Sequence, residues 1–348
     1  MKKTKVMHLL QSNEYSGAEN MVCEIIDMYR NEDNYEMIYC SPNGHIAQML
    51  EKREVNFYPL KRMSLFEIWK VVKIYQPNII HAHDATASVL ASFFWKKIKI
   101  ICHIHGNHIN MRSFSLKSML VRLCSCVWKK IIWVSQSSFD DYYYKNEVKE
   151  KSIVIPNIIS QKSIMCKMDQ DRTEYRYDGI FLGRINSIKN PLRALKIIKD
   201  VCKEQPSLKF AFVGDGDLLG ACQNYVQNNS INKNVDFLGY MENPIKLLSC
   251  CKFLLMTSVY EGTPMCAIEA MGTGVPIIST PTDGMVELID QNETGYYSND
   301  DSELVHSILT LLHDNKLQES MSNKSKKRFN ELMNVESYKQ KLKKIYEM

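Results

Sequence analysis

The chain of 348 residues is long enough for two domains, and its composition, 45% hydrophobic and 24% charged, excludes a disordered protein. Its 11 cysteines are scattered through mostly apolar segments, which argues against a disulfide framework or a zinc ribbon and favours reduced, buried thiols. The net charge of +5 is uneven, because residues 1–170 carry 23 Lys and Arg against 16 Asp and Glu. This basic half predicts an anionic partner.

The start of the chain resembles a signal sequence only superficially. The basic "MKKTK" is followed by an apolar run that His8 and Gln11 interrupt, and no stretch reaches the about 18 apolar residues that a membrane span needs. We therefore expect a cytoplasmic protein.

Apolar runs rich in β-forming residues recur along the chain, with helical patterns such as 18–30 and 115–128 between several of them. In order, the predicted strands are "KVMHLL", "YEMIYC", "NFYPL", "NIIHAH", "KIICHIH", "KIIWVS", "SIVIP", "YDGIFLG", "KFAFVG", "VDFLG", "KFLLMTS", "VPIIST" and "TGYYS". The alternation predicts an α/β protein of two Rossmann-like domains, each with a mostly parallel sheet covered on both faces. Segment 160–176 loses the periodicity and is predicted to be a linker.

Ligands of open α/β sheets bind beyond the carboxyl ends of strands, so the residues after each strand matter most. After "YDGIFLG", Arg184 and Lys189 bracket a loop that ends at Asn190–Pro191, a predicted helix start. Two cations beside a helix N-terminus suit a phosphate clamp, although a solvated basic loop has the same sequence pattern.

The segment "DGDLLG" follows the next strand and has two interpretations. Gly214 and Gly216 permit a tight turn and a close approach of the backbone to a ligand. Asp215 and Asp217 look like the metal-binding pair of metal-dependent sugar transferases, but a bare D-x-D is a weak signal. We favour a glycine turn over a metal site.

Two further strand ends, both in the first half, carry candidate residues. In "HLLQSNEYSGAEN", Gly17 could bring backbone N–H groups to a phosphate or could merely ease the turn, and Glu19 suits the first helical turn. The histidines of "IIHAHD" share one strand face, as do His103 and His105 of "CHIHGNH". Hydrogen bonding or packing is favoured for them over metal binding, and His105 at the strand end is best placed to contact a substrate hydroxyl.

The stretch "EGTPMCAIEAMGTGVPI" predicts a helix with one carboxylate before it and another inside it. Thr263 is expected at the N-cap, Pro264 at the first helical position and Gly272 as the stop. Glu261 then lies in the loop above the helix and Glu269 in its second turn. A helix N-terminus attracts anions, so acids there need another purpose, such as binding the hydroxyl groups of a sugar.

In this order, these motifs resemble those of the retaining glycosyltransferases of family 4, which have the GT-B fold. The strongest signal is Glu261-Gly262-x-Pro264, Glu269-Ala270-Met271 and Gly274-x-Pro276, similar to the family's E-x7-E signature. "FLGRINSIKNP", "FVGDGDL", "FLGYMEN" and "TGYYSND" follow the family's C-terminal domain in order. The similarity is specific mainly after residue 178.

The resemblance implies a role for each matching residue. Glu269 would hold the ribose hydroxyls of the nucleotide, Glu261 would lie beside the donor sugar, and Arg184 and Lys189 would neutralise the diphosphate in place of a metal ion. His105 matches a histidine near the donor sugar, although His103 is an alternative. The other implied donor-binding positions are Gly17, Gly214, Gly262, Thr263 and Pro264.

Two departures from the family pattern leave the donor open. The chain has Ser16–Gly17 where relatives often have Gly-Gly, and "MCAI" follows Pro264 without the small residue that some relatives show. Neither the nucleotide base nor the sugar, the acceptor, the linkage or the oligomeric state follows from the sequence.

The resemblance also implies the overall architecture. Two Rossmann-like domains would face each other across a cleft, with an acceptor-binding domain at 1–165 and a nucleotide-sugar domain at 166–328. The last helix, 329–348, would cross back to the first domain. Family habit implies same-face attack on the donor, with no protein nucleophile, no cofactor and no metal.

The expected activity is transfer of a hexose or N-acetylhexosamine from a UDP-sugar to a lipid-linked or growing surface glycan, as in capsule, exopolysaccharide or lipopolysaccharide synthesis. The basic, aromatic segments 93–99 and 111–134 would suit the anionic inner face of the cell membrane, and no nucleic-acid motif is evident. A nucleotide-sugar epimerase and a catalytically silent nucleotide-sugar-binding subunit are the alternatives.

Overall fold

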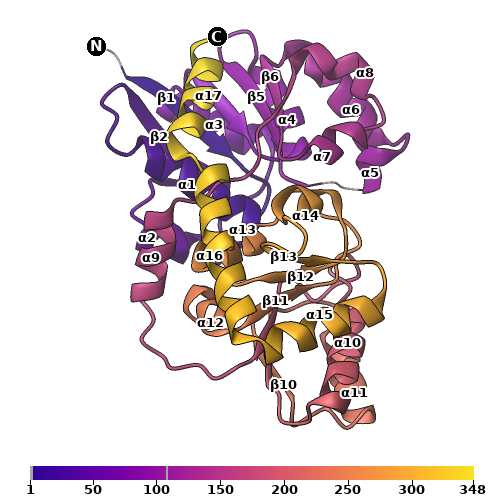
Figure 1. Cartoon of the computed structure of the whole chain (residues 1–348). Coiled ribbons are helices and arrows are strands. Elements are labelled where there is room, and N and C mark those ends of the chain that lie inside the picture. The colour runs from indigo at the N-terminus through magenta and orange to yellow at the C-terminus, as the bar shows by residue number, and fades with distance from the viewer. Residues whose placement is uncertain (1–2, 107–108) are drawn as a thin grey trace. The chain divides into compact units, whose positions relative to one another are not determined.

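A computed structural model describes residues 3–106 and 109–348 (Figure 1). The chain forms two compact units. The first unit comprises Met1–Ile158 together with Val335–Met348, and the second unit is Ile159–Asn334. The chain thus passes between the units at 158/159 and at 334/335, whereas the divisions predicted from the sequence fall after 165 and 328.

The first unit is built on a parallel sheet of seven strands in the order β3-β2-β1-β4-β5-β6-β7. Its strands are β1 (Thr4–Leu9), β2 (Tyr35–Pro42), β3 (Phe57–Leu60), β4 (Ile79–Ala82), β5 (Lys99–Ile104), β6 (Lys130–Trp133) and β7 (Ser152–Val154). Its helices are α1 (Gly17–Tyr29), α2 (Ile46–Lys52), α3 (Leu65–Tyr75), α4 (Ala85–Ala91), α5 (Ile109–Arg112), α6 (Leu116–Cys124), α7 (Gln136–Asp140), α8 (Lys145–Val148) and α17 (Val335–Glu347). Short 3₁₀ turns η1 (Ser92–Phe94), η2 (Ser125–Val127) and η3 (Lys149–Lys151) complete it.

The second unit has a parallel sheet of six strands in the order β10-β9-β8-β11-β12-β13. Its strands are β8 (Gly179–Leu182), β9 (Phe210–Val213), β10 (Val235–Gly239), β11 (Phe253–Met256), β12 (Ile277–Ser279) and β13 (Gly295–Tyr297). Its helices are α9 (Gln161–Asp169), α10 (Pro191–Glu204), α11 (Leu219–Asn228), α12 (Ile245–Cys250), α13 (Met265–Thr273), α14 (Asp283–Leu288), α15 (Asp301–His313) and α16 (Asn315–Leu332).

Each of the thirteen predicted runs is confirmed as a strand. The interior strands are buried on both faces, and parallel strands of this kind need continuous apolar sequence. In β1, for example, Val6, Met7 and Leu9 are all fully buried although they alternate between the two faces of the sheet. Helices cover both faces in each unit (Figure 1). The predicted α/β class with two Rossmann-like units is therefore correct.

Two predictions at the ends of the second unit are wrong in detail. The predicted linker 160–176 begins with helix α9, whose N-cap Ser160 accepts a hydrogen bond from the Ser163 N–H at 3.0 Å. Its apolar pattern is weak because Ile164 is the one residue of this helix that is fully buried. The predicted single helix 329–348 is two helices, since α16 ends at Leu332 and α17 begins at Val335.

Helix α17 packs on the first unit, far from its neighbours in sequence. The Tyr29 hydroxyl donates to the Lys339 carbonyl at 3.0 Å, and the Lys99 ammonium donates to the Tyr346 carbonyl at 2.6 Å. The Tyr346 hydroxyl lies 2.9 Å from His81 Nδ1. The last helix is therefore an integral layer of the first unit.

Both sheets have a point where the strand order reverses, between β1 and β4 in the first unit and between β8 and β11 in the second. Such switch points open a crevice at the carboxyl ends of the strands, where ligands of doubly wound folds bind. The polar residues described next lie at these two points.

Candidate active site

The strongest cluster of predicted site residues lies in the second unit, after β8 and β11. The Lys189 ammonium donates a short hydrogen bond to the Glu261 carboxylate, although the two residues are 72 positions apart. The same carboxylate oxygen accepts a hydrogen bond from the Ser258 hydroxyl at 2.6 Å. The structure thus joins two residues that the sequence analysis assigned separately, one to the diphosphate and one to the sugar.

Local sequence explains why Lys189 is held at this place. Pro191 occupies the first position of α10, as predicted, and Asn190 before it is left-handed with φ 49°. The Lys189 N–H donates to Asn186 Oδ1 at 3.1 Å, and the Thr257 hydroxyl donates to the carbonyls of Lys189 and Asn190 at 3.2 and 2.9 Å. The end of β11 therefore ties down the loop that follows β8.

The negative charge of Glu261 favours the charged form of Lys189. Desolvation acts to lower the pKa of Lys189, but the Glu261 carboxylate outweighs it, and the pKa is raised overall. The Arg184 guanidinium acts in the lowering direction, which puts its positive charge near Lys189. Arg184 itself lies exposed in the loop after β8. An anion that reached both cations would compete with Glu261 for Lys189.

Glu269 lies on α13, the helix that follows Glu261, and its side chain is largely buried. The ammonium of Lys167 of α9 lies 3.9 Å from the Glu269 carboxylate. A buried carboxylate has strong acceptor capacity for hydroxyl donors such as those of a ribose.

The ends of α13 differ from the prediction. Pro264 is the N-cap rather than the first helical residue, with extended φ −73° and ψ 126°, so Thr263 lies one position outside. The helix continues through Gly272 and stops at Gly274, which is left-handed at φ 79°. Gly272 is required by packing rather than by the end of the helix, because a Cβ there would lie 2.2 Å from Ile164 Cδ1 of α9.

Glycines near the cluster serve close backbone contacts. A Cβ on Gly214 would lie 1.9 Å from the Gly183 carbonyl oxygen, so the predicted close approach at Gly214 is to the chain itself. A Cβ on Gly284 would lie 1.4 Å from the carbonyl oxygen of Gly262, the residue after Glu261. These approaches fix the loops that hold Lys189 and Glu261.

Asp215 and Asp217 are both exposed. Asp215 Oδ1 accepts from the Gly216 N–H at 2.7 Å, which is a local turn contact. Within residues 3–106 and 109–348, the groups of three or more potential metal ligands are made of histidines, and neither aspartate belongs to one.

Sequence reasoning missed two side chains of the cluster. Ser258 ends the run "KFLLMTS", so a hydroxyl at a strand end was a usable signal. Cys266 precedes Glu269 by three residues on the same helix face. Burial raises the pKa of its thiol to about 12, against the opposing effect of the Lys189 charge. Cys266 is therefore a neutral, apolar neighbour of the charged pair.

Gly17 and His105 belong to the first unit. Gly17 is exposed and opens α1, where Ser16 forms a capping box with Glu19, so Glu19 occupies the first turn as predicted. Ser16 Oγ donates to Glu19 Oε2 at 2.5 Å, which places a carboxylate at this helix start.

His105 is the partly exposed end of a row of stacked histidines from β1, β4 and β5. We call the five the histidine cluster: His8, His81, His83, His103 and His105. Burial lowers the pKa of His8 to about 3 and that of His105 to about 4, the latter against the opposing effect of Asn157, and it lowers the other three well below the usual value. The cluster is thus neutral at physiological pH.

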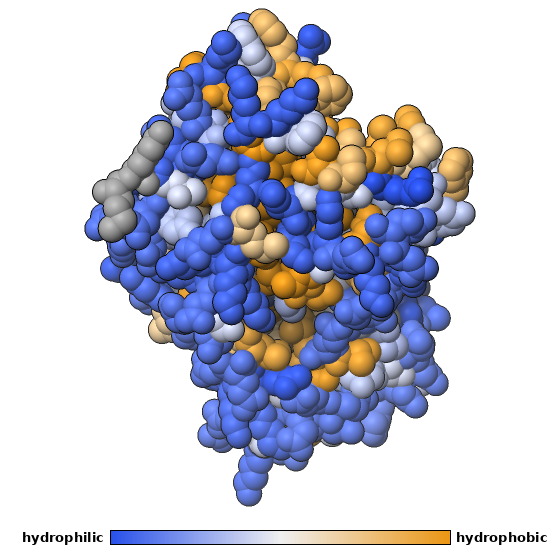
Figure 2. All heavy atoms as spheres, turned by 90° about the horizontal axis from the view of Figure 1, so that it is seen from above, coloured by the Kyte–Doolittle hydropathy of each residue, from blue (hydrophilic) through white to orange (hydrophobic). Residues whose placement is uncertain are grey.

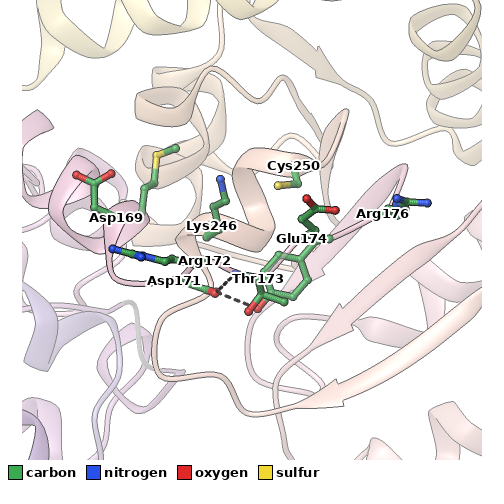
Figure 3. Close-up of a pocket in the computed structure, with 10 residues that line it drawn as sticks. Asp169, Asp171, Arg172, Thr173, Glu174, Arg176, Lys246 and Cys250 are labelled. Atoms are coloured by element: carbon green, nitrogen blue, oxygen red, sulfur yellow. Dashed lines mark hydrogen bonds between the residues drawn. The ribbon is translucent and has the colours of Figure 1, made fainter.

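A separate pocket of about 690 Å³ lies between the segment after α9 and helix α12 (Figure 3). Asp171 accepts from the Thr173 N–H at 2.8 Å and from the Tyr175 hydroxyl at 2.9 Å, so it braces its own loop. The pocket's described lining contains none of the predicted site residues, and it belongs to the connecting segment rather than to the cluster around Lys189.

The first unit also carries an apolar surface. A groove of about 500 Å³ runs between α4 and α6, lined by Val89, Leu90, Leu116 and Leu120 with Lys117 beside them. Exposed large apolar side chains gather in this unit: Phe66, Trp69, Ile74, Phe93, Trp95, Phe114, Leu116, Leu123 and Tyr143. Figure 2 shows apolar patches amid hydrophilic surface on the face it presents.

None of the helices, as far as the chain is described, combines the length and apolar character needed to cross a membrane.

Comparison with known proteins matches both halves of the chain. Residues 15–162 match the description Glycosyltransferase Family 4, and residues 169–328 match Glycosyl transferases group 1. Over 97% of its length the chain is 22% identical to UDP-Gal:alpha-D-GlcNAc-diphosphoundecaprenol alpha-1,3-galactosyltransferase of Escherichia coli, covering 96% of that protein.

A second relative is GalNAc-alpha-(1->4)-GalNAc-alpha-(1->3)-diNAcBac-PP-undecaprenol alpha-1,4-N-acetyl-D-galactosaminyltransferase of Campylobacter jejuni, 32% identical over 55% of the chain and 53% of that protein. Among solved structures, Anabaena HepE in complex with UDP and glucose superposes with a TM-score of 0.82 at 19% identity, covering 98% of both chains. With a GT-B fold and a family match in each half, the chain belongs to the family 4, group 1 glycosyltransferases and is a glycosyltransferase.

Proposed function

We propose that the protein transfers a hexose or N-acetylhexosamine from a UDP-sugar to a lipid-linked or growing surface glycan, with retention of anomeric configuration and without a metal ion. The observation that carries the proposal is the Lys189–Glu261 pair at the switch point of the second sheet. It supplies a cation for a leaving diphosphate and a carboxylate for a sugar, side by side.

The donor is proposed from the second unit. Glu269, buried on α13, accepts hydrogen bonds from the ribose hydroxyls, and the backbone of Gly262, Thr263 and Pro264 contacts the sugar. The UDP and glucose bound in the Anabaena protein, and the UDP-Gal in the name of the Escherichia coli relative, favour UDP as the nucleotide.

The chemistry follows from the charges. When the diphosphate binds, Lys189 exchanges its bond to Glu261 for one to phosphate, and Glu261 becomes free to accept from a sugar hydroxyl. The bond from the anomeric carbon to the phosphate oxygen breaks, and Lys189 and Arg184 stabilise the developing charge, as a metal ion would. The acceptor oxygen attacks from the same face, and its proton passes to the departing phosphate oxygen. No residue is nominated as nucleophile.

His105 and Gly17 remain donor-contacting residues on the strength of the family resemblance. Gly214 holds the loop beside Lys189 through its close contact with Gly183, so its contribution to donor binding is proposed to be indirect.

The acceptor proposal rests on the first unit. Its apolar groove between α4 and α6 suits a polyprenyl chain, and Lys117 at the groove suits the phosphates of a lipid-linked sugar. Exposed aromatic residues beside lysines suit an anionic membrane surface: Lys70 lies 4.4 Å from the Phe66 ring centroid and Lys73 lies 5.1 Å from that of Trp69. A peripheral location on the inner face of the cell membrane is proposed accordingly.

The test uses purified protein, a panel of UDP- and GDP-sugars, EDTA throughout, and a bacterial lipid extract as acceptor. We expect nucleotide release that depends on one donor and rises when the extract is added, with an α-linked product from an α-linked donor by NMR. Release of an epimerised nucleotide sugar without acceptor would establish the epimerase alternative. Binding without turnover in any combination would favour the silent subunit, and loss of activity in EDTA would overturn metal independence.

Membrane association is tested by sedimentation with vesicles. We expect binding to vesicles rich in anionic lipid and little to neutral ones, reduced several-fold in Trp69→Ser because about 1–3 kcal/mol of apolar burial is lost. Val286→Ser is the matched control, since Val286 is an exposed apolar residue of the second unit. Equal binding by all three proteins, or equal binding to neutral vesicles, would contradict the surface assignment.

A further inference from the structure

The histidine cluster has more nitrogen atoms than the surrounding protein can satisfy. His8 Nδ1 lies 2.9 Å from His83 Nε2, and His83 Nδ1 lies 2.9 Å from His105 Nε2, which makes a hydrogen-bonded chain of three rings. Both ring nitrogens of His103 are buried and have no hydrogen-bond partner among the described residues. Native proteins rarely leave such groups unsatisfied, so this arrangement needs an explanation.

We propose that His83, His103 and His105 bind a divalent transition-metal ion of the zinc class. Each offers one ring nitrogen, and these three atoms all lie within 4.8 Å of one another. Two nitrogens that share a tetrahedral zinc ion at about 2.0–2.1 Å lie about 3.3 Å apart. The hydrogen-bonded nitrogens of His83 and His105, 2.9 Å apart, must therefore separate slightly, and the two rings must turn so that both lone pairs point at one ion. Imidazole nitrogen is a preferred ligand of zinc, copper and nickel ions.

One tautomer of His8 leaves the lone pair of His83 directed at His105. If His8 Nε2 carries its proton toward the Met37 sulfur, 3.5 Å away, then His8 Nδ1 accepts from His83 Nε2. His83 Nδ1 is then the unprotonated nitrogen, and it faces His105. Partners of this kind orient ligating histidines in metal sites.

Metal binding requires only one rearrangement of protons. In the metal-free protein His105 Nε2 donates to His83 Nδ1, so His105 must move its proton to Nδ1 before Nε2 can act as a ligand. The three imidazoles stay neutral, and no proton is released overall. Three protein ligands leave at least one coordination position for water.

The neighbouring triad of His8, His81 and His83 is a poorer site, although its ligand atoms also lie within 4.8 Å of one another. His81 Nδ1 is engaged by the Tyr346 hydroxyl, and all three rings are buried, which closes the route of entry. His105, by contrast, is partly exposed at the end of β5 and gives an ion access.

The inference does not rest on the proposed transferase activity. It has one consequence for that activity, because an ion on His105 Nε2 holds a ring that is assigned to contact the donor sugar. Zinc is therefore expected to inhibit rather than support turnover.

The test measures zinc binding by equilibrium dialysis of full-length, tag-free protein after treatment with a chelator. Two exposed thiols that could bind zinc are first removed by Cys126→Ser and Cys166→Ser. We expect one ion per chain, a raised midpoint of thermal unfolding, and a zinc-edge X-ray absorption spectrum with nitrogen or oxygen but no sulfur ligands.

His103→Asn is expected to weaken binding about 100-fold or more, because even outer-shell partners are worth 10–100-fold. The matched control is His306→Asn, which removes an exposed histidine of the second unit and should bind as the parent does. If His103→Asn does not fold, His105→Asn at the exposed end carries the same expectation. Absence of a retained ion, sulfur ligation, or undiminished binding in the folded variant would each overturn the proposal.

Discussion

The two switch points bury polar groups in opposite ways. The first unit gathers five neutral imidazoles, whereas the second pairs a lysine with a carboxylate. Neutral rings are stable in a buried site only while they stay unprotonated, and a buried ion pair only while both partners are present. The first arrangement is therefore sensitive to pH and the second to the loss of either side chain.

The largest expected effect is acid instability of the first unit. The folded pKa of each cluster histidine is lowered from 6.5, so the unfolded chain binds more protons, and stability that is present above pH 6.5 is lost as the pH falls. Each histidine that titrates independently lowers the free energy of unfolding by about 1 kcal/mol as the pH falls from 6.5 to about 5.5. Urea unfolding in the presence of EDTA should show a loss of several kcal/mol.

The control for this prediction is His103→Asn, which should flatten the pH profile by removing one titrating ring. A parent profile that is flat between about pH 7 and about pH 5.5 would mean that the histidines are already solvated or charged in the folded protein.

Removal of the cation from the Lys189–Glu261 pair should have the next largest effect. Lys189→Ala is expected to lower turnover by about 10²-fold or more, since it removes a group that stabilises the leaving charge and leaves the partly buried Glu261 carboxylate without its cation. Lys196→Ala is the matched control, because it removes an exposed lysine from α10, the helix that Lys189 precedes. Nucleotide release by the two variants is the measurement, and near-normal turnover of Lys189→Ala would remove the phosphate clamp from the proposal.

The smallest effect is a difference in stability between variants of two buried tyrosines of α17. Tyr346→Phe should destabilise the first unit by about 1–2 kcal/mol, because it leaves His81 Nδ1 without its partner at 2.9 Å. Tyr338→Phe is the matched control, since the Tyr338 hydroxyl is buried and has no partner among the described residues. Denaturant unfolding should leave this control unchanged or slightly more stable. Equal losses would mean that the hydroxyl of Tyr346 does not support the histidine cluster.

Local sequence predicted the strands well because the interior strands are continuous apolar runs, and it predicted the start of α10 from Asn190–Pro191. It misplaced the end of α13, where two glycines compete. Gly272 is required by side-chain packing against α9, while Gly274 has the left-handed backbone that stops the helix. Sequence alone does not tell a packing glycine from a capping one.

The polar clusters were predictable only in part. Alternation in β4 and β5 put each histidine pair on one face, but their meeting with His8 depends on β1 lying beside β4 in the sheet. The pairing of Lys189 with Glu261 depends likewise on β8 lying beside β11. Spacing along the chain carries no information about which strands become neighbours.

The return of α17 to the first unit has a consequence for biosynthesis. The chain must pass through all of Ile159–Asn334 before the helix that bears Tyr346 exists. During translation the second unit can therefore be complete while the first still lacks a packing layer. Tyr29 and His81 stay without their partners in α17, which lie more than 260 residues later in the chain. Of the two units, the one whose synthesis begins first is the one completed last.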